Sequence, residues 1–282
     1  MMTPVMEEAF EAHRPTLQAI AYRMLGSAAE AEDIVQEAWL RWQATPRDEV
    51  RSERAFLSTV VTRLCLDHLK SARATREVYP GPWLPEPVQT DAGVDPETIS
   101  LAFLVLLESL SPVERAVYLL HEVFGYSHAE VARMVGKEEA ACRQSLHRAR
   151  EHIQARRPRF APSKQAHERL VLGFLSACVS GDLESLKHLL AEDVTVWSDG
   201  GGKARGAATR PVRGADSVAR LYIGGAKKAA HGVVPEIIEV NGWPALVLRL
   251  QGVVLNVITF ETDGERIHAI RSVLNPDKLV RV

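Results

Sequence analysis

The segment from Ser111 to Ile153 carries the side chains best suited to reading DNA. On its last predicted helix, Cys142, Leu146 and Ala149 fall on one face at helical spacing, so the opposite face is small, polar and basic. Amide and guanidinium groups in such positions donate to base edges in the major groove, and basic flanks contact phosphates. The outward set consists of Ala140, Gln144, His147 and Glu151, flanked by Arg143 and Arg148.

Local signals divide this segment into short helices. Ser111 followed by Pro112 begins a first helix, which Gly125 ends, and Ser127 with Glu130 forms a capping box that starts a second. Gly136 ends the second helix, and a third follows at once. The pattern predicts a helix-turn-helix that inserts its last helix into the major groove. The alternative is a plain helical hairpin with a solvated face.

Composition sets the limits of the prediction. The chain has 282 residues, 46% of them hydrophobic, which indicates several small cores rather than one helical domain. Its net charge of −2 requires that DNA contacts come from local basic patches. The 3 cysteines lack disulfide or zinc spacing, so we expect neither metal nor cofactor. Without an apolar run of membrane length or a signal peptide, we expect a soluble cytoplasmic protein.

The amino-terminal part is predicted to be helical. One helix runs from Pro15 to Leu25, a second starts at Ser27, and a long third helix covers residues 52–74. The second helix places an apolar leucine inside an acidic outward face, which suggests a protein partner: Asp33, Gln36, Glu37 and Leu40. The third has a basic side, either a solvated face or a phosphate track: Arg63, Lys70 and Arg73, with Arg76 just beyond.

Two linkers separate the predicted domains. Residues 79–96 are rich in proline and cannot form a long helix, yet Trp83 and Leu84 lie in their middle. A flexible tether has no use for a tryptophan, so we expect this segment to dock on another part of the protein. A helix from Ile99 to Leu110 follows, and residues 155–164 form a second, basic linker broken by proline.

The carboxy-terminal part has an α+β pattern. Asp182 caps a helix, residues 194–197 form a strand, and a helix runs from about Asp216 to Lys228. Four strands follow, with Asn241-Gly242 and Asp263-Gly264 as tight turns. We therefore predict a cone of helices on a curved antiparallel sheet, with a cavity between them. The expected domains are residues 1–78, 97–156 and 165–282, joined by linkers 79–96 and 157–164.

The chain resembles a known protein family. The stretch AYRMLGSAAEAEDIVQEAWLRW, the long helix after it and the helix-turn-helix are similar to bacterial RNA polymerase sigma factors of the extracytoplasmic-function type. The carboxy-terminal part resembles the SnoaL-like, NTF2-fold extension of one subgroup, which is marked by WLPEP, DGGGK and NPDKL. All three motifs are present: Trp83, Leu84, Pro85, Glu86 and Pro87; Asp199, Gly200, Gly201, Gly202 and Lys203; Asn275, Pro276, Asp277, Lys278 and Leu279.

The resemblance implies a transcription initiation factor. It places Asp33, Ile34, Val35, Gln36 and Glu37 on the clamp helices of the polymerase largest subunit, in agreement with the outward face that includes Leu40. Residues 53–76 would engage the minus-ten promoter element. The helix from Lys137 to His152 would read the minus-thirty-five element, with this expected DNA-contacting set: Lys137, Glu139, Ala140, Arg143, Gln144, His147 and Arg148.

The resemblance also implies regulation within the chain. Most relatives are held inactive by a separate anti-sigma protein, whereas this subgroup carries its regulator in cis, and we expect the three motifs to form an intramolecular contact. SnoaL-type folds include cyclases and isomerases, so an acid/base site is an alternative, with these candidates: Asp199, His188, His231 and His268. We expect a regulatory module instead, with a small-molecule ligand as an open option. A ligand-sensing helix-turn-helix regulator independent of polymerase is the other alternative.

Overall fold

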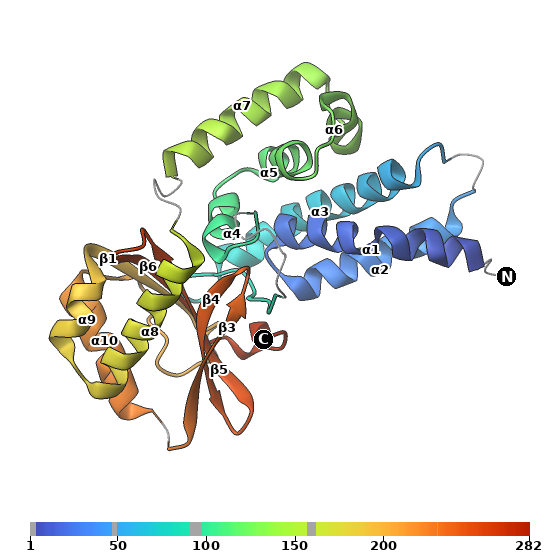
Figure 1. Ribbon diagram of the computed structural model, residues 1–282. Helices are drawn as coiled ribbons and strands as arrows, with labels where there is room; N and C mark the ends of the chain where they lie inside the picture. Colours follow the sequence, from blue (N-terminus) through green and yellow to red (C-terminus); the bar gives the residue numbers. More distant parts are fainter. Residues whose placement is uncertain (1–3, 47–49, 91–97, 157–161, 230) are drawn as a thin grey trace. The chain divides into compact units, whose positions relative to one another are not determined.

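The computed structural model describes residues 4–46, 50–90, 98–156, 162–229 and 231–282 (Figure 1). Contacts divide the chain into two compact units. The first consists of residues 1–77 and 104–157, and the second of residues 78–103 and 158–282. Each unit is described by itself. Within the described residues, no helix is both long enough and apolar enough to cross a membrane.

The first unit begins with α1 (Pro4–Leu25), α2 (Ala28–Ala44) and α3 (Glu53–Glu77). The helix expected to begin at Pro15 begins at Pro4 instead and continues through the proline. Proline removes one backbone hydrogen bond there, but packing of the early turns on α2 offsets the loss. Phe10 is fully buried with its ring 4.9 Å from that of Trp39, and the Trp42 indole donates to the Met6 carbonyl at 3.1 Å.

The helix-turn-helix also lies in the first unit. It comprises α5 (Pro112–Tyr118), a turn of π-helix, η3 (Leu119–Val123), α6 (His128–Val135) and α7 (Glu139–Arg156). The capping boxes at Ser111 and Ser127 are both present, and Gly136 ends α6 in the left-handed conformation with φ 68°. The helix α4 (Leu101–Glu108) precedes them and crosses the boundary between the units in the sequence.

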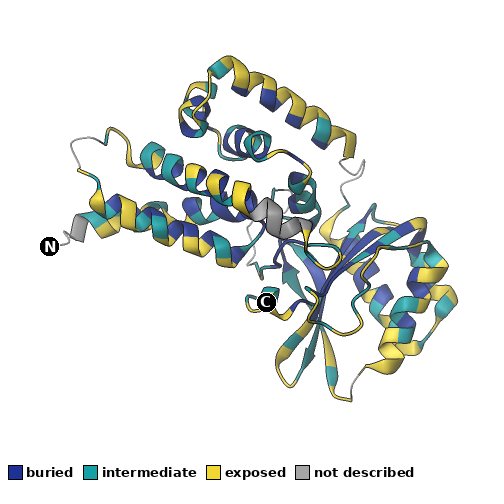
Figure 2. Ribbon diagram, turned by 180° about the vertical axis from the view of Figure 1, so that it is seen from behind, coloured by how far each residue is buried: buried dark blue, intermediate teal, exposed yellow. Residues whose placement is uncertain are grey.

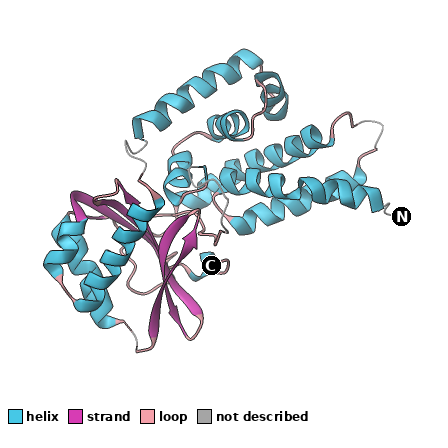
Figure 3. Ribbon diagram, in the orientation of Figure 1, coloured by secondary structure: helices cyan, strands magenta, loops and turns pink. Residues whose placement is uncertain are grey.

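The second unit contains a mixed sheet, which Figure 3 shows with its helices. The helices are α8 (Lys164–Ser180), α9 (Leu183–Leu189), α10 (Ala215–Lys228) and the short 3₁₀ turn η4 (Pro276–Lys278). The strands are β1 (Leu190–Asp199), β2 (Val212–Arg213), β3 (Val233–Val240), β4 (Trp243–Leu250), β5 (Val253–Thr262) and β6 (Ile267–Val273), in the order β2-β1-β6-β5-β4-β3.

The strands β3 to β6 form the expected antiparallel meander, whereas β1 pairs with β6 in parallel. The expectation of a wholly antiparallel sheet is therefore wrong for this pair. A parallel pair needs a long crossover, and the many residues between β1 and β6 supply one. Asn241 and Gly242 both have positive φ, 51° and 79°, as the tight β3–β4 turn requires.

The helices α8, α9 and α10 cover one face of the sheet (Figure 1). Figure 2 colours the sheet largely as buried, and the buried residues of α8, α9 and α10 join those of the strands in one apolar cluster. The ring of Phe174 lies 4.9 Å from that of Tyr222 and 5.0 Å from that of Phe260, inside an apolar cluster. Packed aromatic rings thus lie between the helices and the sheet, the region where the sequence predicts a cavity.

Candidate functional site

Asp199, at the end of β1, organises the contact between the three short motifs. Its carboxylate is fully buried. It accepts hydrogen bonds from the Tyr79 hydroxyl at 2.6 Å, the Leu84 N–H at 2.9 Å and the Gly201 N–H at 3.1 Å. Burial of the Tyr79 hydroxyl, with its bond to Asp199, raises the pKa of this tyrosine, so it remains a donor at neutral pH. We call this cluster the motif junction: Tyr79, residues 83–87, residues 199–203 and residues 275–279.

Lys278 supplies the counter-charge in the motif junction. Its ammonium lies 2.8 Å from the Asp199 carboxylate and donates to the Leu84 carbonyl at 2.6 Å. The same ammonium lies 4.1 Å from the centroid of the Trp83 ring, a cation–π distance. The Lys278 side chain is 12% exposed, so the pair is largely removed from water. Trp83 thus has a structural partner, as its position in a proline-rich linker suggested.

The glycines of DGGGK allow the turn to approach its neighbours closely. A Cβ atom on Gly201 would lie 2.5 Å from Cγ of Asn275, and Gly201 itself has φ 58°. A Cβ atom on Gly202 would lie 2.9 Å from Cγ of Pro80. Contacts this short exclude a side chain at either position, so the glycines let NPDKL and the linker pack onto the turn.

The linker continues past the motif junction along the edge strand β3. Asn241 exchanges hydrogen bonds with Val88, its N–H donating to the Val88 carbonyl at 2.9 Å and its side-chain oxygen accepting from the Val88 N–H at 3.1 Å. Its amide also donates to the Ile99 carbonyl at 2.9 Å. Near the carboxy terminus, Arg281 pairs with the buried carboxylate of Glu86 at 2.7 Å. The linker therefore packs as part of the second unit.

Three participants were not singled out in the sequence: Tyr79, Asn241 in its side-chain role, and Arg281. Asn241 was predicted as a turn residue, which the positive φ explains fully, so its second role left no signal. Tyr79 and Arg281 lie just outside WLPEP and NPDKL. They could have been predicted by looking for aromatic or basic residues next to a motif whose carboxylate must be buried.

On α7 the predicted reading face is exposed. Its side chains are on the solvent side, whereas Cys142, Leu146 and Ala149 are buried. Several of them form ion pairs: Arg143 with Glu139 at 2.8 Å, and Arg148 with Glu114 at 2.8 Å. The remaining exposed side chains of the predicted set are Lys137, Ala140, Gln144 and His147.

The basic residues of α3 are divided between two environments. Lys70 is exposed and pairs with Asp67 at 2.8 Å. Arg63 donates to the carbonyls of Arg133 and Met134 at the end of α6, at 3.0 and 3.2 Å. The side chains of Arg73 and Arg76 lie outside those that the structure describes. A groove of about 490 Å³ adjoins Arg63 and is also lined by three further arginines: Arg41, Arg51 and Arg133.

On α2 the predicted partner surface is exposed in part. Asp33 and Gln36 are exposed, and the Leu40 side chain is 54% exposed. Glu37 is half-buried and pairs with Arg41 at 3.0 Å. The other predicted contact residues, Ile34 and Val35, are buried in the core of the unit, where they position the exposed side chains.

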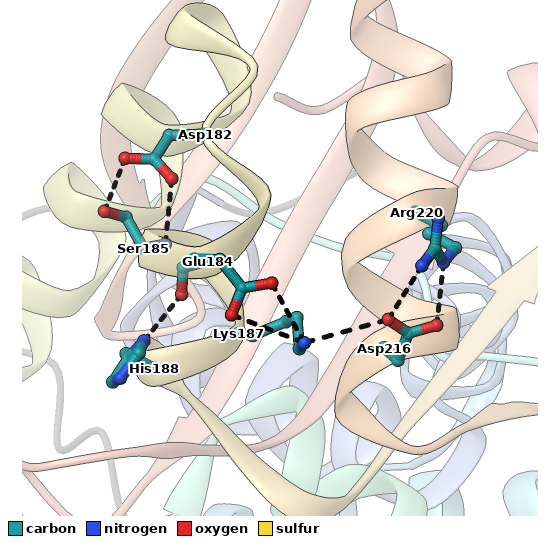
Figure 4. A network of polar contacts seen from close by, with 7 residues as sticks. All are labelled: Asp182, Glu184, Ser185, Lys187, His188, Asp216 and Arg220. Carbon is teal, nitrogen blue, oxygen red and sulfur yellow. Dashed lines mark hydrogen bonds and ion pairs between the residues drawn. The ribbon is translucent and has the colours of Figure 1, made fainter.

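The candidate acid/base residues do not meet in one place. Asp199 is saturated by its donors in the motif junction. His188 is exposed on α9 and donates from Nδ1 to the Glu184 carbonyl of its own helix at 2.7 Å (Figure 4). In the same view Lys187 contacts Glu184 and Asp216, which joins α9 to α10. This network therefore stabilises the packing of the helices and does not form an acid/base site.

The other two histidines are also on the surface. His231 is exposed in the loop before β3. His268 is exposed and bonds Asp263 at 2.7 Å in the β5–β6 turn. Although burial raises the pKa of Asp263, its bonds from His268 and from two backbone N–H groups prevail and lower that pKa to about 2. The pair therefore holds a turn, and neither histidine faces the apolar cluster between helices and sheet.

Models of two known protein families match the two helical parts of the chain. The model of Sigma-70 region 2 matches residues 9–75, and that of Sigma-70, region 4, matches residues 100–153. The "ECF RNA polymerase sigma factor SigJ" of Mycobacterium tuberculosis is 40% identical over 95% of this chain and 91% of its own length. A "Probable ECF RNA polymerase sigma factor SigI" of the same species is 33% identical over 96% and 93%.

A solved structure agrees over nearly the same span. The crystal structure of M. tuberculosis SigJ superposes with a TM-score of 0.76 at 37% identity, covering 95% of this chain and 96% of that one. The similarity thus extends through the carboxy-terminal sheet as well as the helical domains.

Proposed function

This chain belongs to the extracytoplasmic-function sigma factors of RNA polymerase, and from that premise we propose that its carboxy-terminal domain controls transcription initiation in cis by holding the linker between the sigma domains. Sigma factors are initiation factors rather than enzymes. They bind RNA polymerase and direct it to promoter DNA. Region 2 corresponds to α1–α3, and region 4 to the helix-turn-helix.

The exposed surfaces suggest which helix binds polymerase and which helices bind promoter DNA. In our proposal the α2 face formed by Asp33, Gln36 and Leu40 binds the clamp helices of the largest polymerase subunit. The helix α3 contacts the minus-ten element, and α7 reads the minus-thirty-five element through Arg143 and Gln144. These side chains are exposed, whereas the opposite faces of α2 and α7 are buried, and this supports the assignment.

The observation that carries the regulatory proposal is the buried Asp199–Lys278 pair. It ties the linker, the DGGGK turn and the carboxy-terminal tail together. Residues 78–103 connect region 2 to region 4, so holding them limits how far the two sigma domains can separate. Because all the partners are in one chain, their effective concentration is high and no separate anti-sigma protein is required.

Truncation tests this proposal. One variant lacks residues 275–282, which removes Lys278 and Arg281 while keeping the sheet, and a second lacks residues 164–282. Run-off transcription and core-polymerase binding are measured for both, and we expect altered promoter-dependent activity in each. Val280→Ser is the matched control, since that side chain is 77% exposed and lies in the same tail. Full-length activity in both truncations would exclude control by this domain.

Replacing Gln144 with alanine should weaken promoter discrimination. A bidentate contact to a base contributes roughly 1–3 kcal/mol, so we expect a loss of about 5- to 150-fold at the preferred sequence and little change at a random one. Gln154→Ala, at an exposed position further along α7, is the control. The measurement is competitive binding by the polymerase complex. Gel shifts without polymerase separate this function from that of an independent regulator, for which they would show specific binding.

A further inference from the structure

The loop between β1 and β2 concentrates positive charge in the carboxy-terminal domain. Residues 203–213 contain four cations and no acidic residue. Lys203 pairs with Asp277 in the motif junction, whereas the other three cations are exposed. Within the described part of the chain, their guanidinium groups have no hydrogen-bond or ion-pair partner. We call these three residues the loop arginines: Arg205, Arg210 and Arg213.

Many surface cations elsewhere in the chain are paired with carboxylates. Arg143 pairs with Glu139 on α7 at 2.8 Å, and Arg220 pairs with Asp216 on α10 at 2.7 Å. Exposed pairs of this kind stabilise a fold little and leave a face that is close to neutral. The loop arginines have no such carboxylate among the described residues, so their charge remains available to an anionic partner.

The loop returns to the strand from which it starts, which keeps the loop arginines together. It begins at the DGGGK turn, where the Lys203 N–H donates to the Gly200 carbonyl at 2.9 Å. It ends at β2, where Arg213 pairs with Thr195 of β1. The strand β2 is at the edge of the sheet, in the order β2-β1-β6-β5-β4-β3. The loop arginines therefore lie in one compact loop at this edge.

The same loop packs against the linker that joins region 2 to region 4. A Cβ atom on Gly81 of the linker would lie 3.5 Å from Cα of Thr209, and Gly81 has φ 87°, a conformation that favours glycine. Gly202 approaches Pro80 in the same way. Because residues 78–103 connect the two sigma domains in the sequence, the loop arginines stay beside that connection while the motif junction holds.

The chemistry of the loop fits phosphates better than a protein surface. Arginine donates two parallel hydrogen bonds to a phosphate group through its planar guanidinium. Protein interfaces instead centre on apolar or aromatic anchors, and the described residues with large exposed hydrophobic side chains include none between 199 and 217. A chain with a net charge of −2 needs local basic patches of this kind to bind DNA.

We propose that the loop arginines bind the phosphate backbone of promoter DNA between the minus-ten and minus-thirty-five elements. The carboxy-terminal domain thereby adds a sequence-independent DNA contact to those made by α3 and α7. The motif junction, which holds the linker, also positions this contact. The inference rests on the proposed promoter-binding function and goes beyond it, because it gives the carboxy-terminal domain a direct part in binding DNA.

The test compares the full-length chain with a triple variant, each in complex with core polymerase. The variant carries Arg205→Gln, Arg210→Gln and Arg213→Gln, and its fold should be retained because these side chains are exposed. Affinity for a promoter fragment is measured by competition at a series of salt concentrations. A control variant loses the same charge at three other exposed cations whose side chains have no partner among the described residues: Lys227→Gln, Lys228→Gln and Arg266→Gln.

Each phosphate contact contributes about 0.9 to the slope of the logarithm of affinity against the logarithm of salt concentration. We expect the triple variant to reduce this slope by roughly two to three and to weaken promoter binding about tenfold or more at ~0.1 M salt. The control variant should retain the wild-type slope. On a promoter whose phosphates between the two elements are replaced by neutral methylphosphonates, the triple variant and the wild type should bind equally.

An unchanged slope in the triple variant would overturn the proposal, and so would a difference in affinity that persists on the neutral spacer. Weaker binding of the triple variant to core polymerase without DNA, with an unchanged salt slope, would show that the loop contacts an acidic protein surface instead. Failure of the promoter-binding function itself would be seen separately, as the absence of specific promoter binding by the wild-type complex.

Discussion

Replacing Asp199 with asparagine should release residues 79–90 from the carboxy-terminal domain. An amide has one acceptor oxygen for four donors, and its NH₂ group would face the ammonium of Lys278, which is only 12% exposed. Leaving a buried charge without its partner costs about 3–5 kcal/mol. Hydrogen exchange at the amides of Leu84, Val88 and Asn241 should therefore accelerate by about two to four orders of magnitude.

A matched control lies on the same strand. Asp193 is an exposed carboxylate of β1, and Asp193→Asn should leave the exchange of these amides unchanged. Run-off activity of the Asp199 variant should change in the same direction as that of the chain lacking residues 275–282. Protection equal to wild type would mean that the motif junction does not hold the linker.

The sequence supported a helix wherever a local signal sufficed. Ser111 and Ser127 begin helices because their capping boxes act over three residues, and Gly136 ends one because only glycine adopts its φ readily. The start of α1 could not be found this way. Pro15 indicates a boundary, and the helix passes it because Phe10 and Trp42 pack between α1 and α2, a contact that no local pattern encodes.

The candidate site shows the same division. The tryptophan in a proline-rich linker predicts that the linker docks, and the family resemblance predicts that WLPEP, DGGGK and NPDKL form the contact. The structure brings the three motifs together around Asp199. The hydrogen bonds of Arg63 could not be predicted from the sequence. A basic stripe on a helix can face solvent, bind phosphates or donate to the carbonyls of another helix. Only the position of α6 in the fold shows that Arg63 donates to carbonyls of α6.

Leu40→Asp should weaken the affinity for core polymerase by about 30-fold or more. Leu40 is 54% exposed within the polar α2 face, and we expect it to act as a hot-spot anchor, whose loss from an interface costs about 2 kcal/mol or more. The aspartate would lose apolar burial and would have to shed its own hydration on binding. The fold should persist, because this side chain contributes little to the core, and thermal melting checks that it does.

Leu172→Asp on α8 is the matched control, since Leu172 is 51% exposed and lies in the second unit. Both variants carry the same change in charge, so a difference between them reports the location rather than the chemistry. Titration of labelled factor with core enzyme gives the two affinities. Equal affinities would place the polymerase contact outside the α2 face. A loss of affinity in the Leu40 variant alone would establish that the α2 face binds polymerase, which promoter selection by α7 requires.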